Sequence, residues 1–92
     1  MKNNYKLYEE IIDQDTWHIH YLRVNEKMVR ITCDLMRPNR KFWQSKTLWY
    51  NWTYCSAEDS NLLKAFADNI IIEYYNQKRA INTLDDFFKT ES

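Results

Sequence analysis

The sequence predicts a single α+β domain, residues 1–92, with the element order α-β-β-β-α. Segment 56–78 repeats apolar residues at helical spacing, whereas three segments before it alternate in polarity as strands do. A sheet with one apolar face needs a helix to cover that face. We therefore expect a three-stranded antiparallel meander with an N-terminal helix and a long C-terminal helix on one face. The other face should be largely uncovered.

The segment from Ser56 to Lys78 is predicted as one amphipathic helix. Steps of about 100° per residue place its apolar side chains in a single arc: Leu62, Leu63, Phe66, Ala67, Ile70, Ile71 and Tyr74. Ser56 is placed to cap the first turn, and Lys78 lies near the end where the helix dipole favours cations. Ile72 and Tyr75 fall outside the arc, so we expect them on the exposed side of the helix.

Upstream of this helix, the pattern predicts a short helix followed by a β-hairpin. Residues 4–13 separate apolar from charged side chains at helical spacing, whereas a strand would place Glu9 among apolar neighbours. Residues 16–24 and 28–36 alternate in polarity and predict the two strands of the hairpin.

The parity of the hairpin loop decides which side chains share a face. An odd loop around Asn25 gathers the apolar residues of both strands on one face, whereas an even loop would mix the faces. The odd register places His18 opposite Asp34 and His20 opposite Thr32. The chain has no glycine, so its turns must use Asn, Asp, Pro or residues with negative φ.

Residues 46–55 predict the third strand. The more apolar of its two rows is expected to face the helices: Leu48, Tyr50, Trp52 and Tyr54. Trp49 is then expected on the uncovered face, together with Arg30. A large indole that faces away from the core is typical of a partner-binding residue, because interfaces favour aromatic side chains and Arg.

Composition and charge exclude several classes of protein. With 45% hydrophobic residues, the chain is too apolar to be disordered. Its net charge is zero, although residues 23–46 carry +5 while residues 1–16 and 47–92 carry −2 and −3. A neutral total argues against an acidic nucleic-acid mimic and against a strongly basic coating protein. Four Trp and seven Tyr exceed the need of one small core, which indicates a partner surface.

The sequence predicts a cytoplasmic location and no membrane partner. No apolar run approaches the roughly 20 residues of a membrane span, and the first ten residues lack the apolar stretch of a signal peptide. Two cysteines do not make a disulfide framework, so we expect both thiols to be reduced.

The basic loop 37–46 is the strongest local indication of nucleic-acid binding. Its cations can neutralise phosphates, and its aromatic rings can stack on bases. The residues predicted for this role are Arg37, Arg40, Lys41, Trp43 and Lys46. The alternative is a solvated surface loop whose Phe42 and Trp43 lie under the long helix.

Metal binding and catalysis have little support in the sequence. His18, His20 and Asp34 have the outline of a metal site, but the pattern supplies no fourth ligand, so polar residues on an exposed sheet face are expected. There is no Gly-rich phosphate loop, nucleophile elbow or Cys/His pair at a recognised spacing. Cys33 falls on the predicted core face, where a thiol is inert. We predict no cofactor, no metal and no catalytic residue.

These observations predict a small non-catalytic protein that binds and inhibits a host protein, such as a CRISPR or restriction nuclease. Residue types with AT-rich codons (Phe, Tyr, Met, Ile, Asn and Lys) make up 39 of the 92 residues, as in many phages, mobile elements and low-GC bacteria. The predicted partner-binding residues are Trp49, Arg30, Ile72 and Tyr75. Alternatively, Phe87 and Phe88 fold back over Ile72.

The predicted partner is a host protein or a protein–nucleic acid complex. Nucleic acid alone, bound by the basic loop, is the alternative to this function. A second copy of the chain, giving a homodimer, is a further candidate partner.

Overall fold

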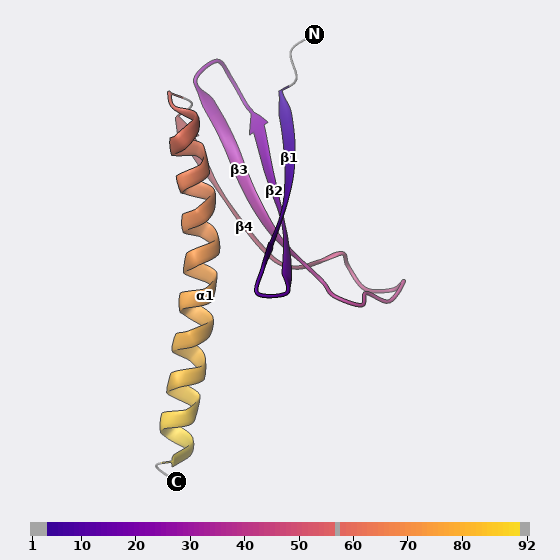
Figure 1. Ribbon diagram of the computed structural model, residues 1–92, viewed down its shortest axis with the longest axis vertical. Helices are drawn as coiled ribbons and strands as arrows, with labels where there is room; N and C mark the ends of the chain where they lie inside the picture. Colours follow the sequence, from indigo (N-terminus) through magenta and orange to yellow (C-terminus); the bar gives the residue numbers. More distant parts are fainter. Residues whose placement is uncertain (1–3, 57, 91–92) are drawn as a thin grey trace.

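The structure, a computed structural model, describes residues 4–56 and 58–90 and has an α+β fold. Its elements are, in chain order, β1 (Tyr5–Ile12), β2 (Asp15–Arg23), β3 (Met28–Met36), β4 (Thr47–Ser56) and α1 (Ser60–Thr90). The strands form one antiparallel sheet in the order β1-β2-β3-β4. Helix α1 packs against β3 and β4, and its C-terminal half continues past the end of the sheet (Figure 1).

Residues 5–12 form an edge strand, so the predicted N-terminal helix is wrong and the sheet has four strands instead of three. The helical interpretation avoided a strand face that combines Glu9 with Tyr5 and Leu7. In the sheet, Glu9 does share a face with these residues, and its Oε2 lies 3.0 Å from Nε2 of His18 on β2. Pairing along the whole of β2 therefore stabilises a strand whose own alternation is weak.

The turn between β1 and β2 consists of Asp13 and Gln14, both with positive φ (48° and 73°). Ile12 and Asp15 pair directly across it. A two-residue hairpin loop with positive φ at both positions is the type I′ turn, which matches the twist of the strands and favours Asn-Gly or Asp-Gly. Because the chain has no glycine, Gln14 adopts a left-handed conformation that its Cβ disfavours.

The hairpin of β2 and β3 has the predicted odd register. His18 lies opposite Asp34, and His20 lies opposite Thr32. The inner face of this hairpin supplies most of the core, which is buried beneath α1: Trp17, Ile19, Val29, Ile31, Cys33 and Leu35. The observed register confirms the prediction. It could be predicted because each strand has one clearly apolar face, and only a loop of odd length buries both of these faces together.

Strand β4 presents the opposite face from the one predicted. The register places Trp49 opposite Leu35, Thr53 opposite Ile31, and Cys55 opposite Val29. Residues directly opposite each other share a sheet face. The row expected to face the helices therefore lies on the helix-free face, while Trp49 packs against the core. Counting apolar side chains gave the wrong face, because the less apolar row of β4 continues the core of β3.

Helix α1 begins later and ends later than predicted. Asp59 is its N-cap residue: its Oδ1 accepts a hydrogen bond of 2.9 Å from the Asn61 backbone N–H. Ser56, the predicted cap, is the last residue of β4, and Ala57 lies outside the described residues. The helix buries Ala67, Ile70 and Ile71, all from the predicted arc.

The contact between helix and sheet is centred on Trp17, which is fully buried. Its Nε1–H donates to the hydroxyl of Tyr75 at 3.0 Å, and that hydroxyl donates to Oδ2 of Asp15 at 2.7 Å. Burial, helped by the hydrogen bond to Asp15, raises the pKa of Tyr75 to about 12. The predicted exposure of Tyr75 is therefore wrong. The Tyr75 hydroxyl is hydrogen-bonded to Trp17 and Asp15 within the protein. A helical wheel that sorts residues by polarity alone does not take account of such a buried hydrogen bond.

We predict that Gln14→Gly stabilises the protein by about 1 kcal/mol, because glycine adopts positive φ without the steric cost of a Cβ. The melting temperature should rise by about 4–8 °C for a domain of this size. Thermal unfolding followed by far-UV circular dichroism measures the change.

Gln14→Ala is the matched control, because it shortens the side chain but keeps the Cβ. It should leave the melting temperature nearly unchanged. If Gln14→Gly lowered the melting temperature, the left-handed turn described here would be incorrect.

Candidate functional site

One face of the sheet is covered by no described element, and we call it the open face. It consists of alternate residues from all four strands: Tyr5, Leu7, Glu9 and Ile11; His18, His20 and Leu22; Arg30, Thr32 and Asp34; Tyr50, Trp52 and Tyr54. Apart from Glu9, its two edge strands carry aromatic and aliphatic side chains, and apart from Leu22, its two central strands carry polar side chains. The predicted uncovered face therefore exists, with a different row of β4 on it.

Arg30 and Trp52 form a preassembled pair on the open face. The Arg30 guanidinium carbon lies 4.9 Å from the centre of the Trp52 ring, within cation–π range. Tyr54 lies opposite Arg30 and contacts Trp52 edge-on at 5.2 Å between ring centres. Among the described residues, the buried Nε of Arg30 has no hydrogen-bond partner. A buried unpaired donor costs about 1–3 kcal/mol, so the isolated protein leaves this pair incompletely satisfied.

A hydrogen-bonded chain crosses the middle of the open face. Nε2–H of His20 donates to Oδ2 of Asp34 at 2.8 Å, and Nδ1 of His20 is hydrogen-bonded to the Tyr5 hydroxyl. Tyr5 also stacks on the His20 ring. Because both ring nitrogens are engaged, His20 holds three strands together and has no free nitrogen for a substrate proton. His18 pairs separately with Glu9.

These polar residues do not form a metal centre within residues 4–56 and 58–90, where no group of three or more His, Cys, Asp or Glu side chains comes together. His18 and His20 instead contact different carboxylates. Cys33 lies in the core as predicted, and burial raises the pKa of its thiol to about 12. It is therefore a neutral thiol at physiological pH and a poor nucleophile.

The basic loop 37–46 projects from the sheet on the side away from α1 (Figure 1) and holds together all five residues predicted for nucleic-acid binding. Its Arg37 Nε and Arg40 Nη1 each donate 3.0 Å hydrogen bonds to loop carbonyls, at Ser45 and Gln44. Phe42 and Trp43 are 94% and 67% exposed at the tip. The alternative in which these rings lie under the helix is therefore wrong.

The residues predicted for partner binding do not form one surface. Arg30 lies on the open face, whereas Trp49 and Tyr75 face the core, and Ile72 is exposed on the other side of α1. Phe87 and Phe88 do not cover Ile72, because α1 continues as one helix and carries them far beyond it. A role of these four residues in binding stays a prediction, but exposure on the open face supports it only for Arg30.

Sequence reasoning missed the aromatic row on β4 as a surface: Tyr50, Trp52 and Tyr54. One signal was available, since the ten residues of β4 include no charged side chain although β4 is an edge strand. Natural edge strands are usually protected by charges. Here the Asn51 side chain accepts from the outward-facing backbone N–H of Trp52 at 2.9 Å.

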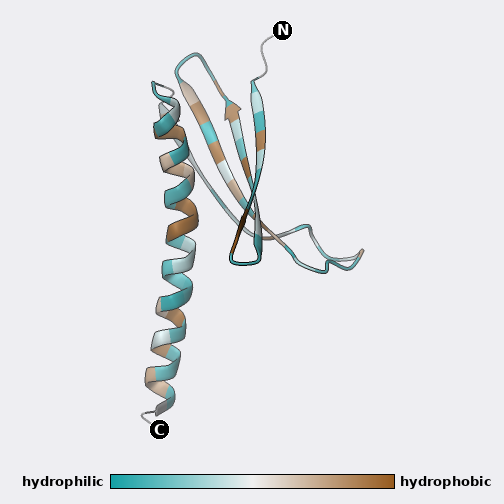
Figure 2. Ribbon diagram, viewed as in Figure 1, coloured by the Kyte–Doolittle hydropathy of each residue, from teal (hydrophilic) through white to brown (hydrophobic). Residues whose placement is uncertain are grey.

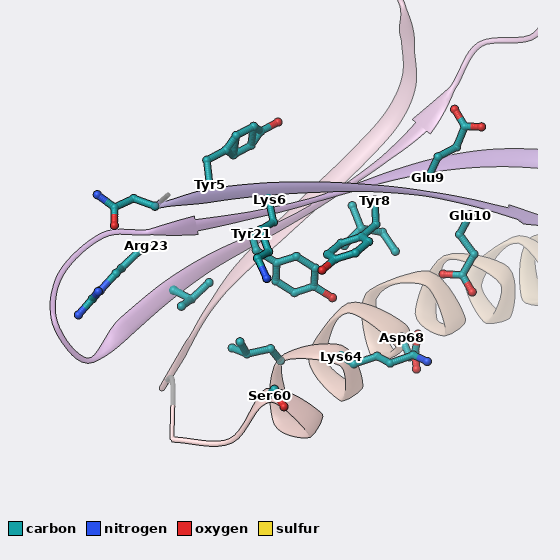
Figure 3. A pocket seen from close by; sticks show the side chains of 14 residues that line it. Tyr5, Lys6, Tyr8, Glu9, Glu10, Tyr21, Arg23, Ser60, Lys64 and Asp68 are labelled. Atoms are coloured by element: carbon teal, nitrogen blue, oxygen red, sulfur yellow. The ribbon is translucent and has the colours of Figure 1, made fainter. Parts of the chain in front are cut away.

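A groove of about 560 Å³ lies between the inner face of β1 and β2 and the first half of α1 (Figure 3). Tyr8 and Tyr21 line it, in edge-on contact with each other, and Lys64 and Asp68 lie on its helical side. Burial raises the pKa of Tyr21 to about 12, so its hydroxyl stays protonated. The groove exists because α1 covers β3 and β4 and leaves the inner face of β1 open.

Comparisons of the chain with protein-family models, with curated proteins and with solved structures find no match. Within the described residues, no helix has the length and apolar character needed to span a membrane. The surfaces above are therefore the observations from which a function is inferred.

We predict opposite effects for two tryptophans of β4. Trp49→Ala should destabilise the fold by about 3 kcal/mol, because Trp49 packs against Trp17 and Tyr74. Trp52→Ala should cost less than about 1 kcal/mol, because it lies on the open face. Urea denaturation of both variants measures the difference. A larger loss for Trp52→Ala than for Trp49→Ala would contradict the register of β4.

Proposed function

We propose that this protein is a non-catalytic binding protein that recognises another protein through its open face. The observation that supports this most strongly is the Arg30–Trp52 pair, flanked by Tyr54 and by the uncharged edge strand. Trp, Tyr and Arg are the residue types most enriched among binding hot spots.

Charge favours a protein partner over nucleic acid at this face. Glu9 and Asp34 place two carboxylates among its aromatic residues, against the single guanidinium of Arg30. Carboxylates repel phosphates, whereas a protein partner can supply matching cations and hydrogen-bond donors. An apolar margin with a polar centre is compatible with the mixed composition of protein interfaces.

We further propose that the partner is a host protein, alone or in a nucleic-acid complex, and that binding inhibits it. A CRISPR or restriction nuclease is the target class. The AT-rich residue usage supports an origin in a phage or another mobile element. A cytoplasmic location is part of this proposal, and the two free cysteines, Cys33 and Cys55, are compatible with it.

We predict that the protein inhibits target cleavage by at least one nuclease in a panel of purified CRISPR and restriction enzymes. Trp52→Ala should raise the inhibitory concentration about 30-fold, the equivalent of a hot spot of about 2 kcal/mol. Arg30→Lys should also weaken inhibition, because Lys keeps the charge but lacks the planar guanidinium. Plasmid-cleavage assays over a concentration series measure both effects.

Phe42→Ala is the matched control, since it removes an exposed aromatic ring outside the open face. This variant should have the same inhibitory concentration as the wild type. Absence of inhibition across the panel would contradict the inhibitor proposal. Inhibition that survives both Trp52→Ala and Arg30→Lys would contradict the assignment to the open face.

Nucleic-acid binding by the basic loop is a second candidate function, supported by one specific observation. The loop exposes two adjacent aromatic rings, Phe42 and Trp43, beside Arg40 and Lys41. This arrangement combines stacking surfaces with phosphate-neutralising cations, as single-strand binding surfaces do. It is independent of the open face, so each candidate function can be tested without the other.

We predict that any nucleic-acid affinity falls linearly with salt on logarithmic axes. The double variant Arg40→Ala and Lys41→Ala should reduce the slope by about 1.4 on single-stranded DNA and by about 1.8 on duplex DNA. Fluorescence anisotropy at several salt concentrations measures the slope, and Lys78→Ala is a control that removes a distant cation. Failure to bind DNA or RNA at low salt would exclude this function.

A further inference from the structure

The C-terminal part of α1 lies beyond the part of the helix that packs on the sheet (Figure 1). Contacts of α1 with the sheet extend as far as Tyr74 and Tyr75. Residues 76–90 continue as regular helix for about 22 Å beyond the sheet (Figure 1). A helical segment of this length is marginally stable alone in water, so packing that the monomer lacks would stabilise it.

This projecting segment carries an apolar stripe. Ile81, Leu84 and Phe88 recur at spacings of three and four residues and are 59%, 56% and 67% exposed. The stripe continues the line of Tyr74 and Ile70, which face the sheet about two and three turns before Ile81. Apolar bands recur along the same part of the helix (Figure 2). One stripe is therefore half buried by the sheet and half open to solvent.

We propose that the projecting segment pairs with the same segment of a second copy of this chain. The two helices run antiparallel, and the two-fold axis passes near Ile81. In this arrangement, Phe88 of each copy reaches Tyr74 of the other, where the sheet ends. The alternating spacing of three and four residues is that of helices which pack side by side along an apolar seam.

The sheet selects the antiparallel orientation. It covers the stripe as far as Tyr74, so parallel helices would bring both sheets to the same end and the same side, where they would collide. Antiparallel helices place the two sheets at opposite ends of the pair. The sheet then covers the first half of each stripe, and the helix of the second copy covers the second half.

The charges beside the stripe agree with this orientation. Lys78 and Asp85 flank Ile81 on the same side of the stripe, at nearly equal distances along the helix. An antiparallel pair centred on Ile81 brings Lys78 of each copy to Asp85 of the other. Within residues 4–56 and 58–90, neither of these two side chains forms an ion pair with its own chain. Both are therefore available to the second copy.

The available area indicates a weak dimer. Each copy contributes three apolar side chains of this stripe that are a little more than half exposed, so the paired interface is small. It falls below the roughly 1,000 Å² that a stable specific interface should clear. We therefore expect a monomer–dimer equilibrium that depends on concentration in the micromolar range.

Sedimentation equilibrium of the full chain over a micromolar concentration series tests the proposal. The wild type should dimerise, and Leu84→Glu should weaken dimerisation about 30-fold or more, because it places a charge in the seam. Asn82→Glu is the matched control, since it adds the same charge on the same turn but away from the stripe. Far-UV circular dichroism at low concentration verifies that each variant is folded.

A charge exchange tests the orientation. Lys78→Glu alone and Asp85→Lys alone should each weaken the dimer roughly 5-fold, and the double variant should restore it, since the exchanged charges again face each other. A wild type that stays monomeric across the series would overturn the proposal. So would a dimer that Leu84→Glu leaves intact, and failure of the double variant to restore affinity would overturn the antiparallel orientation.

Discussion

The burial of Trp17 is the constraint on which the arrangement of sheet and helix depends. Its ring contacts Trp49 of β4 and both Tyr74 and Tyr75 of α1. A buried indole N–H needs an acceptor, and the Tyr75 hydroxyl supplies it while donating to Asp15. One side chain of β2 therefore joins β4 to α1, and its hydrogen bond to Tyr75 restricts how α1 is rotated. Another rotation would leave a buried donor unpaired, at a cost of about 1–3 kcal/mol.

The sequence was sufficient wherever an element has one unmistakable apolar face. The hairpin of β2 and β3 and the buried arc of α1 follow from periodicity, because no other register or rotation buries those side chains. Strand β1 could not be predicted in this way, since it is exposed on both faces and Glu9 is satisfied by His18 across the sheet. Such a cross-strand pair depends on tertiary structure, which local alternation does not contain.

Strand β4 shows a second limit of sequence reasoning. Because its inward face was predicted incorrectly, Trp49 was assigned to the exposed surface instead of Trp52. Both of its rows contain aromatic residues, so polarity did not decide between them. The decision came from the partner strand, where Val29, Ile31 and Leu35 require β4 residues of the same face beside them. The exposed row of β4, in which Trp52 lies beside Arg30, was predicted to face the core, because a row of large apolar residues normally indicates a core. The basic loop, in contrast, was predictable because its role depends only on residues close together in sequence.

The order of pairing has a consequence for how this chain folds. Each strand pairs with the strand that precedes it, and α1 then packs on β3 and β4, the strands made just before it. Most contacts therefore join neighbouring parts of the chain, which lowers the entropy of loop closure and favours rapid folding. The contact of Trp17 with Tyr75 spans 58 residues and can form only after the helix exists. The sheet can thus assemble early during synthesis, with docking of the helix onto Trp17 as the closing step.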